Sequence, residues 1–576
     1  MEEKELTGYP SIDRPWLKYY SQDAVDAPLP ECTMYEMVWK NNKEHLDDTA
    51  LNYYGRKFTY GQLFAGIENA AKAFSALGVK KGEVVIICMV NTPEMVYALY
   101  ALNRLGAVVN MVDPRTNVAG IHEYISESNA RFVMTVDLAY QAIEKAAAGT
   151  GVQKIIRVSP ADSLPPVAKV LYRLKNKAPK AGEAALSWKA FLAGGVGASP
   201  SAAVYEKNTC CVMAHTGGTT GFPKTVMLSN DNLNAVTHGY RYVNIPFQRQ
   251  HRYFDDLPPF IIYGLALAIH TTLSYGLQVI LYPKFDSRGF PRLFAKYKPH
   301  HFSALADHLK YLAADPMTRE MDLSFLITPA MGGDSLSTEL EQKINTFLKR
   351  NGCQFEATKG YGMTEIAATG VTSFRGANAI GSVGVPLVCN TIKIMDVDSG
   401  QELKYGQTGE VWISGPSVML GYYNKPGETS EIIVTDENGA RWIRTGDLGH
   451  VDRDGLLFLE GRIRRIYLTT YNGQPAKIFP MPVEDALRKL DAVRDCSVVG
   501  RKRRGSDYYE AVAFIVKEKG SNEEVRRAAA EYCATHVPEY MVPARYLFLD
   551  ELPHTPIGKV DFRALEAMAT EQAETK

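Results

Sequence analysis

Two hydrophobic periodicities alternate along the first part of the chain. Between Thr59 and Leu77 the apolar residues Leu63, Ile67 and Phe74 fall on one face of a helix. The segments that follow are, in order, a strand-like run at 83–90, a helix at 93–105 and a second strand-like run at 107–112. Strands that alternate with helices in this way predict a parallel sheet covered by helices.

The same alternation continues to about Gly461, and the remaining residues read as a smaller unit. A short apolar run at 210–214 has the length of a buried strand, and Asn230 is placed to cap the helix after it. The last hundred residues predict a helix at 483–493, strands at 496–500 and 510–517, and a helix at 523–536. We therefore expect an α/β fold with a large N-terminal domain of helix-covered sheets and a small α+β C-terminal domain.

Composition narrows the classes of function. Lys+Arg and Asp+Glu number 64 each, so the formal net charge is zero, and nothing favours a nucleic-acid partner. The eight cysteines form no C-x-x-C pair, which indicates thiols in a reducing compartment. The acidic first residues are not typical of a signal peptide, and the apolar stretch 264–282 is interrupted by polar residues. The sequence predicts a cytoplasmic protein, with oligomeric state undetermined.

A loop rich in glycine and threonine follows the apolar run at 210–214. Its residues are Thr216, Gly217, Gly218, Thr219, Thr220, Gly221, Phe222, Pro223 and Lys224. Free N–H groups of such a loop form an anion-binding concavity, while the hydroxyls add donors and the lysine adds a mobile charge. The residues suit a polyphosphate, although a polar surface turn has a similar composition. Pro223 before the lysine excludes a Walker A motif.

Four further motifs follow in the chain, and each has an ordinary structural explanation when taken alone. Tyr361-Gly362-Met363-Thr364-Glu365 places a carboxylate beside a hydroxyl, which suits Mg²⁺ held by few carboxylates plus phosphates, or simply a turn after a strand. The others are Ala330-Met331-Gly332-Gly333-Asp334, a Gly-Gly turn; Thr445-Gly446-Asp447 with Gly461-Arg462; and Leu552-Pro553-His554-Thr555-Pro556-Ile557-Gly558-Lys559. An aspartate such as Asp447 can accept both hydroxyls of a ribose.

Together these motifs resemble the adenylate-forming superfamily, in particular acyl-CoA synthetases. The superfamily patterns are Thr-Ser-Gly-Thr-Thr-Gly-x-Pro-Lys-Gly, Tyr-Gly-x-Thr-Glu, Tyr-x-Thr-Gly-Asp with Gly-Arg, and Pro-x-Thr-x-x-Gly-Lys. This chain departs from the first at Gly217 and Thr225. The resemblance implies ATP-dependent activation of a carboxylic acid to acyl-AMP, with Mg²⁺ as cofactor, followed by transfer to coenzyme A.

The resemblance also implies roles for individual residues. The catalytic residues would be Lys559, Thr364 and Glu365, with Glu365 also serving the metal. The nucleotide would be bound by Thr216, Gly218, Thr219, Thr220, Gly221, Lys224, Gly332, Gly333, Asp334, Tyr361, Asp447 and Arg462, and the acid by Ile261, Tyr263 and Gly362. The implied domains are 1–461, a hinge at 462–465, and a mobile lid at 466–576.

Departures from the family pattern bear on the substrate and the acceptor. Ile261 stands where many acyl-activating members have histidine and amino-acid-activating members have aspartate, which favours a medium- or long-chain fatty acid. Asp255 and Asp256 lie nearby but out of register. The hinge carries Arg464 and Arg465, and the segment 467–480, which guides the thiol acceptor in the family, is several residues longer than usual. Two alternatives remain open: a fatty acyl-AMP ligase that loads an acyl carrier protein, and a non-catalytic nucleotide-binding relative.

The segment 161–186 differs in character from its surroundings. Prolines bracket the basic amphipathic run VAKVLYRLKNK within 166–178. One interpretation is a helix that makes peripheral contact with a membrane surface, and long-chain fatty acyl-CoA synthetases are similar here. The other is a solvated surface insertion.

Overall fold

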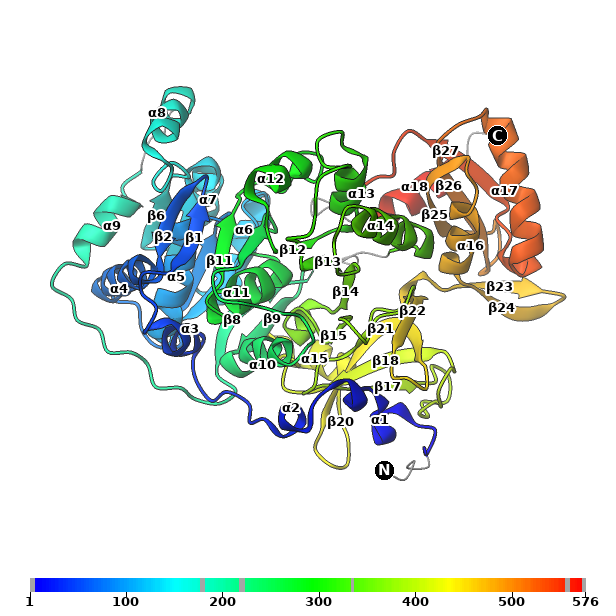
Figure 1. Cartoon of the computed structure of the whole chain (residues 1–576), viewed down its shortest axis with the longest axis horizontal. Coiled ribbons are helices and arrows are strands. Elements are labelled where there is room, and N and C mark those ends of the chain that lie inside the picture. Colours follow the sequence, from blue (N-terminus) through cyan, green and yellow to red (C-terminus); the bar gives the residue numbers. More distant parts are fainter. Residues whose placement is uncertain (1–5, 177–181, 217–222, 333–335, 555–559, 572–576) are drawn as a thin grey trace.

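The computed structural model describes residues 6–176, 182–216, 223–332, 336–554 and 560–571. Two large sheets dominate the part of the chain before Arg462 (Figure 1). One sheet has the order β16-β15-β14-β13-β12-β10-β11-β1-β2 and the other β19-β9-β8-β4-β3-β5-β6-β7. Their central strands pair in parallel, as the alternating pattern predicts.

The strands are short, and the central strands of the eight-stranded sheet are buried along their whole length, as expected where both faces of a sheet are covered. The nine-stranded sheet contains β1 Thr49–Tyr53, β2 Arg56–Thr59, β10 Arg252–Asp255, β11 Gln278–Leu281, β12 His301–Ala304, β13 Thr328–Gly332, β14 Thr358–Tyr361, β15 Val371–Thr372 and β16 Val385–Pro386. The eight-stranded sheet contains β3 Val84–Cys88, β4 Val108–Met111, β5 Phe132–Val136, β6 Lys154–Val158, β7 Ala185–Ser187, β8 Cys210–His215, β9 Thr225–Ser229 and β19 Gly421–Tyr422.

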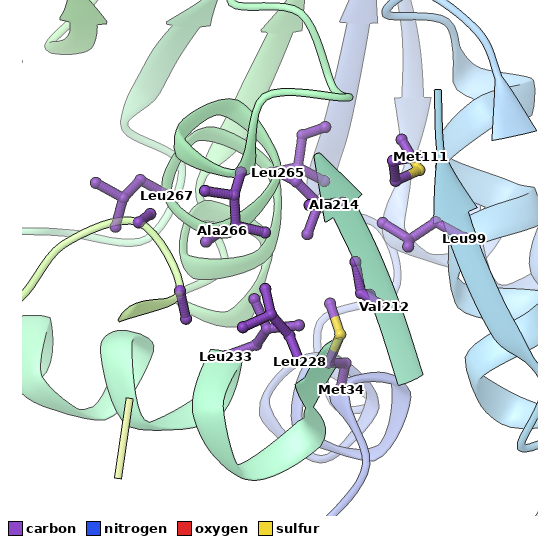
Figure 2. Close-up of a cluster of buried hydrophobic side chains, with 14 of the residues drawn as sticks. Met34, Leu99, Met111, Val212, Ala214, Leu228, Leu233, Leu265, Ala266 and Leu267 are labelled. Carbon is purple, nitrogen blue, oxygen red and sulfur yellow. The ribbon is translucent and has the colours of Figure 1, made fainter. Parts of the chain in front are cut away.

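Helices between the two sheets form the middle layer of the molecule. They are α3 Met34–Asn42, α4 Tyr60–Ala76, α5 Pro93–Arg104, α10 Asn230–Arg241, the π-helix η3 Gly264–Thr271 and α11 Thr272–Ser274. Figure 2 shows how Leu99 and Met111 meet Val212 and Ala214 on one side, while Leu228, Leu233 and Leu265 continue the contact on the other. This shared core joins both sheets into one body.

Other helices cover the outer faces. Against the eight-stranded sheet pack α6 Val118–Ser128 and α7 Tyr140–Ala147, and against the nine-stranded sheet pack α12 Phe290–Tyr297, α13 Ala306–Ala314 and α14 Thr338–Arg350. The remaining helices of this region are α1 Pro10–Asp13, α2 Gln22–Asp26, α8 Pro166–Lys175, α9 Trp188–Gly194 and α15 Pro426–Ile432.

A third, smaller sheet precedes the C-terminal domain. Its strands are β17 Thr391–Met395, β18 Gly409–Ser414, β20 Ile433–Thr435, β21 Arg441–Val451 and β22 Leu457–Arg462. The turn between β21 and β22 contains Asp454 and Gly455, and the positive φ of Gly455, 89°, suits a glycine.

The C-terminal domain has a hydrophobic core of its own. A hairpin of β23 Tyr467–Tyr471 and β24 Gln474–Ile478 leads into a sheet of β25 Val493–Lys502, β26 Tyr509–Lys517 and β27 Arg545–Leu549, with α16 Pro480–Arg488, α17 Asn522–His536 and α18 Phe562–Glu571 around it. Among the described residues, its buried clusters contain no residue before Tyr467. The expected combination of a large α/β domain and a small α+β domain is confirmed.

Some local predictions were wrong. The helix expected at 483–493 ends at Arg488, and Val493 already begins β25. The cap of α10 is Ser229, whose side chain accepts from the Asn232 N–H, whereas Asn230 accepts from the Met34 N–H. In the described part of the chain, no helix is both long and apolar enough to cross a membrane.

Candidate functional site

Two hydrogen bonds join the two ends of the glycine-rich loop. The Thr216 N–H donates to Lys224 O at 3.0 Å, and the Lys224 N–H donates to Thr216 Oγ1 at 3.1 Å. Thr216 and Lys224 therefore lie side by side where β8 and β9 meet the loop. The candidate phosphate ligands Gly218, Thr219, Thr220 and Gly221 lie outside the described residues.

The ammonium of Lys224 is held over an aromatic ring by a carboxylate. Its Nζ lies 2.7 Å from Glu428 Oε2 and 4.7 Å from the centre of the Tyr422 ring. The hydrogen bond from Lys224 lowers the pKa of Glu428 below its ordinary value. Both partners are partly exposed, so a phosphate could compete with Glu428 for the same ammonium.

Glu365 is buried next to this pair. The Tyr422 hydroxyl donates to Glu365 Oε1 at 2.7 Å. Burial raises the pKa of Glu365, and the charges of Arg462 and Lys224 oppose that rise. Thr364 begins the 3-10 turn η4 (Thr364–Ile366) that carries this carboxylate and is only partly buried.

The backbone around Glu365 is unusually constrained. Ala367 and Ala368 have φ angles of 55° and 101°, a region that alanine rarely adopts. A Cβ at Gly362 would lie 1.8 Å from the carbonyl oxygen of Ala368, so glycine is required there by the close approach of the chain. Strain of this kind is often found at functional sites, and here it lies just after Glu365 in the chain.

A second buried carboxylate, Asp447, joins a tyrosine to an arginine. The Tyr361 hydroxyl at the end of β14 donates to Asp447 Oδ2 at 2.7 Å, and Arg462 Nε lies 2.9 Å from Asp447 Oδ1. Asp447 and Arg462 face each other in the β21–β22 ladder, and the Asp447 N–H donates to Thr445 Oγ1. The third sheet thereby places a carboxylate and a guanidinium at the end of the nine-stranded sheet.

The candidate acid-binding residues lie beside the same strand ends. The hydroxyl oxygen of Tyr263 would be 3.2 Å from a Cβ placed on Gly332, at the end of β13. Burial raises the pKa of Tyr263, and the Ser303 hydroxyl, which also bonds Tyr253, opposes the rise. Ile261 is partly buried against the large core. Gly333 and Asp334 lie outside the described residues.

The two out-of-register aspartates are internal to the fold. Asp255 and Asp256 are buried; Asn91 donates to Asp255 Oδ2 at 3.2 Å, and His308 Nε2 lies 3.2 Å from Asp256 Oδ2. Burial and the neighbouring Asp256 hold the pKa of Asp255 well above its ordinary value.

No preformed metal cluster lies within the described ranges, where no group of three or more His, Cys, Asp or Glu side chains could hold an ion. Glu365 is nevertheless a single carboxylate next to hydroxyls and to the phosphate-loop ends. That donor set fits Mg²⁺, which keeps waters and substrate phosphates as its other ligands.

The C-terminal domain meets this region at the chain segment after β22. Burial and the Glu365 carboxylate raise the pKa of Tyr422, and the nearby charge of Arg464 opposes that rise. Arg465 turns the other way and donates to Val498 O at 2.9 Å within the C-terminal domain. Lys559 lies outside the described residues. His554 and Val560, the described residues on either side of that segment, form an isolated antiparallel bridge.

Sequence reasoning missed two contributors, Tyr422 and Glu428. Tyr422 lies in an apolar run, Met419 to Tyr423, which by pattern belongs to the core, and it is 5 % exposed. Its hydroxyl acts on Glu365 and its ring on Lys224, and only the pairing of β19 with β9 brings these groups together.

Comparisons with known proteins agree with this architecture. Residues 38–423 match the family model described as AMP-binding enzyme, and residues 482–559 match the AMP-binding enzyme C-terminal domain. A long-chain-fatty-acid–CoA ligase of Bacillus subtilis is 28% identical over 575 residues, 98% of this chain and 99% of the relative. A 4-coumarate–CoA ligase of Humulus lupulus is 28% identical and aligns over 90% of each chain.

A solved structure shares the fold. The anthranilate CoA ligase AuaEII, determined with anthranoyl-AMP, superposes with a TM-score of 0.79 at 22% identity and covers 96% of this chain and 99% of its own. The family model alone spans most of the chain, and the predicted membership is confirmed: this chain belongs to the AMP-binding enzyme family.

Proposed function

We propose that the protein uses ATP to activate a medium- or long-chain fatty acid as acyl-AMP and then transfers the acyl group to coenzyme A. The observation that carries this proposal is the convergence of Lys224, Glu365, Asp447 and Arg462 at one place from separate motifs. Two cations and two buried carboxylates beside a glycine-rich loop suit a nucleoside triphosphate and its metal ion.

The nucleotide would lie across the strand ends. Asp447, held by Tyr361 and Arg462, would accept the ribose hydroxyls, and Gly332, Gly333 and Asp334 would pack against adenine. The loop 216–224, including Thr216, Gly218, Thr219, Thr220, Gly221 and Lys224, would hold the phosphates, with Thr364 adding a hydroxyl. Bound Mg²⁺ would neutralise phosphate charge at Glu365.

The chemistry needs positioned charge and no protein nucleophile. A carboxylate oxygen of the acid attacks the α-phosphorus, the bond to the β-phosphate oxygen breaks, and pyrophosphate leaves. The thiol sulfur, after losing its proton to solvent, then attacks the acyl carbon, and the bond to the AMP oxygen breaks. Preorganised donors stabilise the charge that develops in each step, while Ile261, Tyr263 and Gly362 position the acid.

Two half-reactions at one site call for movement of the small domain. We assign the acyl-activating domain to 1–461, the hinge to 462–465 and the mobile domain to 466–576. Lys559 would reach the α-phosphate in the first step and withdraw before the thiol enters, and hinge rotation is a known device for such exchange.

Two features support a fatty acid, and two others favour an aromatic acid as the second candidate. Ile261 is apolar, and the Bacillus subtilis relative named for long-chain fatty acids aligns over nearly the whole chain. An aromatic acid is favoured by the Humulus lupulus relative named for 4-coumarate. It is also favoured by the hydroxyls of Tyr253, Tyr263 and Ser303 near Gly332.

The acceptor is the remaining choice. The hairpin β23–β24 occupies the lengthened segment 467–480 and projects from the small domain (Figure 1). Coenzyme A is the acceptor in our proposal, and a carrier protein that docks on this longer hairpin is the alternative.

ATP–pyrophosphate exchange across a panel of carboxylic acids tests the proposal. Fatty acids should drive exchange far better than acetate, because each buried CH₂ contributes about 0.8 kcal/mol. Coumarate as the best substrate would favour the aromatic alternative, and absence of exchange with every acid would indicate a non-catalytic protein. Addition of coenzyme A should then yield acyl-CoA and AMP by mass spectrometry, whereas acyl-AMP that persists would favour the carrier-protein alternative.

A further inference from the structure

Helix α8 projects beyond the neighbouring helices of the N-terminal domain (Figure 1). Its inner side is fastened to the domain, because Ala168 and Tyr172 pack against the large core. Lys169 Nζ donates to Asp162 O at 3.0 Å, and Arg173 lies 3.8 Å from the Asp162 carboxylate. The helix therefore has a defined orientation on the protein surface.

The apolar stripe of α8 faces away from the protein. Val167, Val170, Leu171 and Leu174 recur at the i, i+3, i+4, i+7 spacing of an amphipathic helix. They are exposed by 75, 59, 57 and 77%, and no residue of the helix is buried. In a water-facing helix this stripe would normally turn to the core, so its outward direction indicates a partner that accepts apolar side chains.

Charge decides what kind of partner fits. Between Asp162 and Glu183 the sequence has no acidic residue and five cations, which are Lys169, Arg173, Lys175, Lys177 and Lys180. Lys177 and Lys180 lie outside the described residues, and Lys169 and Arg173 also contact Asp162. The whole chain has a formal net charge of zero, so this is a local excess. A second copy of the chain would bring the same cations against these, whereas an anionic surface would be attracted.

We propose that α8 docks the protein on an anionic lipid surface, with its outward stripe in the boundary between headgroups and acyl chains and the exposed cations Arg173 and Lys175 within reach of the lipid phosphates. The helix has 10 residues and would lie in the interface, since a span of a bilayer takes about 20 residues. The docking is independent of the reaction proposed above and does not require either half-reaction.

Vesicle flotation tests the docking. We compare vesicles of phosphatidylcholine alone with vesicles that also contain phosphatidylglycerol, using the full chain. The parent should float only with the anionic vesicles, and binding should weaken as salt rises, because the Debye length falls from about 10 Å at 0.1 M to about 3 Å at 1 M. Equal flotation with both vesicle types, or with neither, would overturn the proposal.

Val170→Glu/Leu174→Glu replaces two apolar side chains of the stripe by carboxylates and should weaken partitioning by at least about tenfold. The matched control is Val196→Glu/Val204→Glu, since these valines are 85 and 79% exposed but lie outside α8. The control should float like the parent. Equal losses of flotation in both double variants would count against a role for α8. If the α8 variant changes from dimer to monomer without loss of flotation, the partner of the stripe is a second copy of the chain.

Leu171→Trp provides a direct reading of insertion. Its emission should shift to shorter wavelength with anionic vesicles and remain unchanged with neutral ones. Melting temperature, together with pyrophosphate exchange measured without vesicles, should match the parent in every α8 variant. An unshifted tryptophan in a variant that still floats would show that another surface makes the contact.

Discussion

Lys224 has a partner before any phosphate arrives, and this shapes what nucleotide binding must do. Its ammonium is bonded to Glu428 on α15 and lies over the Tyr422 ring. Binding of a phosphate therefore exchanges one anion for another. The exchange is inexpensive, because partly exposed ion pairs contribute at most about 1 kcal/mol.

Removing the competing carboxylate should strengthen nucleotide binding. We expect Glu428→Gln to lower KM for ATP by about two- to fivefold, the range that a contribution of up to about 1 kcal/mol allows. Steady-state kinetics of pyrophosphate exchange measures this. Glu431→Gln, on the same helix and exposed, is the control and should leave KM unchanged. A higher KM in Glu428→Gln would instead indicate that Glu428 assists the nucleotide.

Glu94, which belongs to none of the site motifs, should make folding stability depend on pH. It is 3% exposed on α5, and its Oε1 accepts from the Ser163 hydroxyl, while its Oε2 has no hydrogen-bond partner. Burial raises its pKa to about 7, above the ordinary value of 4.5. The folded state thus retains a proton that the unfolded chain releases, and stability falls as pH rises from 4.5 through 7, by at most about 3 kcal/mol.

Glu94→Gln should remove that dependence. We expect the variant to unfold at a higher denaturant concentration than the parent at pH 8 and to differ less at pH 5. Chemical denaturation across this pH range measures the effect, with the exposed Glu123→Gln as control. A parent whose stability rises steadily from pH 5 to pH 8, with Glu94→Gln following it, would contradict this assignment.

At the scale of elements, pattern predicted the type of most segments better than their ends or the direction of their faces. The alternation of periods was sufficient for β3, α5 and β4, because buried parallel strands and their helices carry strong signals. The end of α16 was wrong because Val493 is apolar in a strand as well as in a helix. The outward direction of the apolar stripe of α8 was not predictable, because an amphipathic pattern shows which residues share a face but not whether that face turns toward the protein.

The candidate site was predictable only as separate motifs. Resemblance placed Lys224, Glu365, Asp447 and Arg462 in one site, and the described geometry brings them together. Tyr422, which touches two of these groups, has the sequence signature of a core residue. Its role follows from the pairing of β19 with β9, a contact nearly two hundred residues apart in the chain.

Arg465 ties the segment after β22 to three elements of the small domain. Its guanidinium binds Glu484 of α16, donates to Val498 O of β25 and lies 3.9 Å from the centre of the Phe562 ring of α18. Arg462, three residues earlier, is bound to Asp447 of the large domain. Any rotation between the domains should therefore be concentrated at Ile463 and Arg464.

Arg465→Met should loosen that attachment. Removing one partner of a buried ion pair costs about 3–5 kcal/mol, and less here because Glu484 still accepts from the Val498 N–H at 2.8 Å. We expect faster hydrogen exchange in α16 and β25 and little change in the large domain. Arg464→Met, whose side chain lies near Tyr422, is the control and should leave exchange in α16 unchanged. Equal exchange in all three proteins would mean that Arg465 does not hold the small domain.

At the scale of the whole molecule, the two domains have separate hydrophobic cores in the described residues and are joined through one short segment. Each core can therefore remain intact while the domains change their relative orientation. This arrangement suits a reaction in which one lysine must act in the first step and leave before the second.

Substitution of Lys559 should slow the first half-reaction and leave the second almost unchanged. In the first step negative charge collects on the α-phosphate and the carboxylate oxygens, where an ammonium stabilises the transition state. Loss of one preorganised donor of this kind typically costs about 10²–10³ in rate, and loss of a full charge can cost more. In the second step the lysine should have withdrawn, so its loss should matter little.

We therefore expect Lys559→Ala to lose most acyl-adenylate formation and to convert supplied acyl-AMP and thiol to thioester at close to the parent rate. Pyrophosphate exchange measures the first half-reaction and thioester formation from acyl-AMP measures the second, on the same preparation. Lys519→Ala, an exposed lysine of the same domain, is the matched control and should retain both activities. Equal loss of both activities in Lys559→Ala would indicate damage to the small domain, and an unchanged first half-reaction would show that another group stabilises the charge on the α-phosphate.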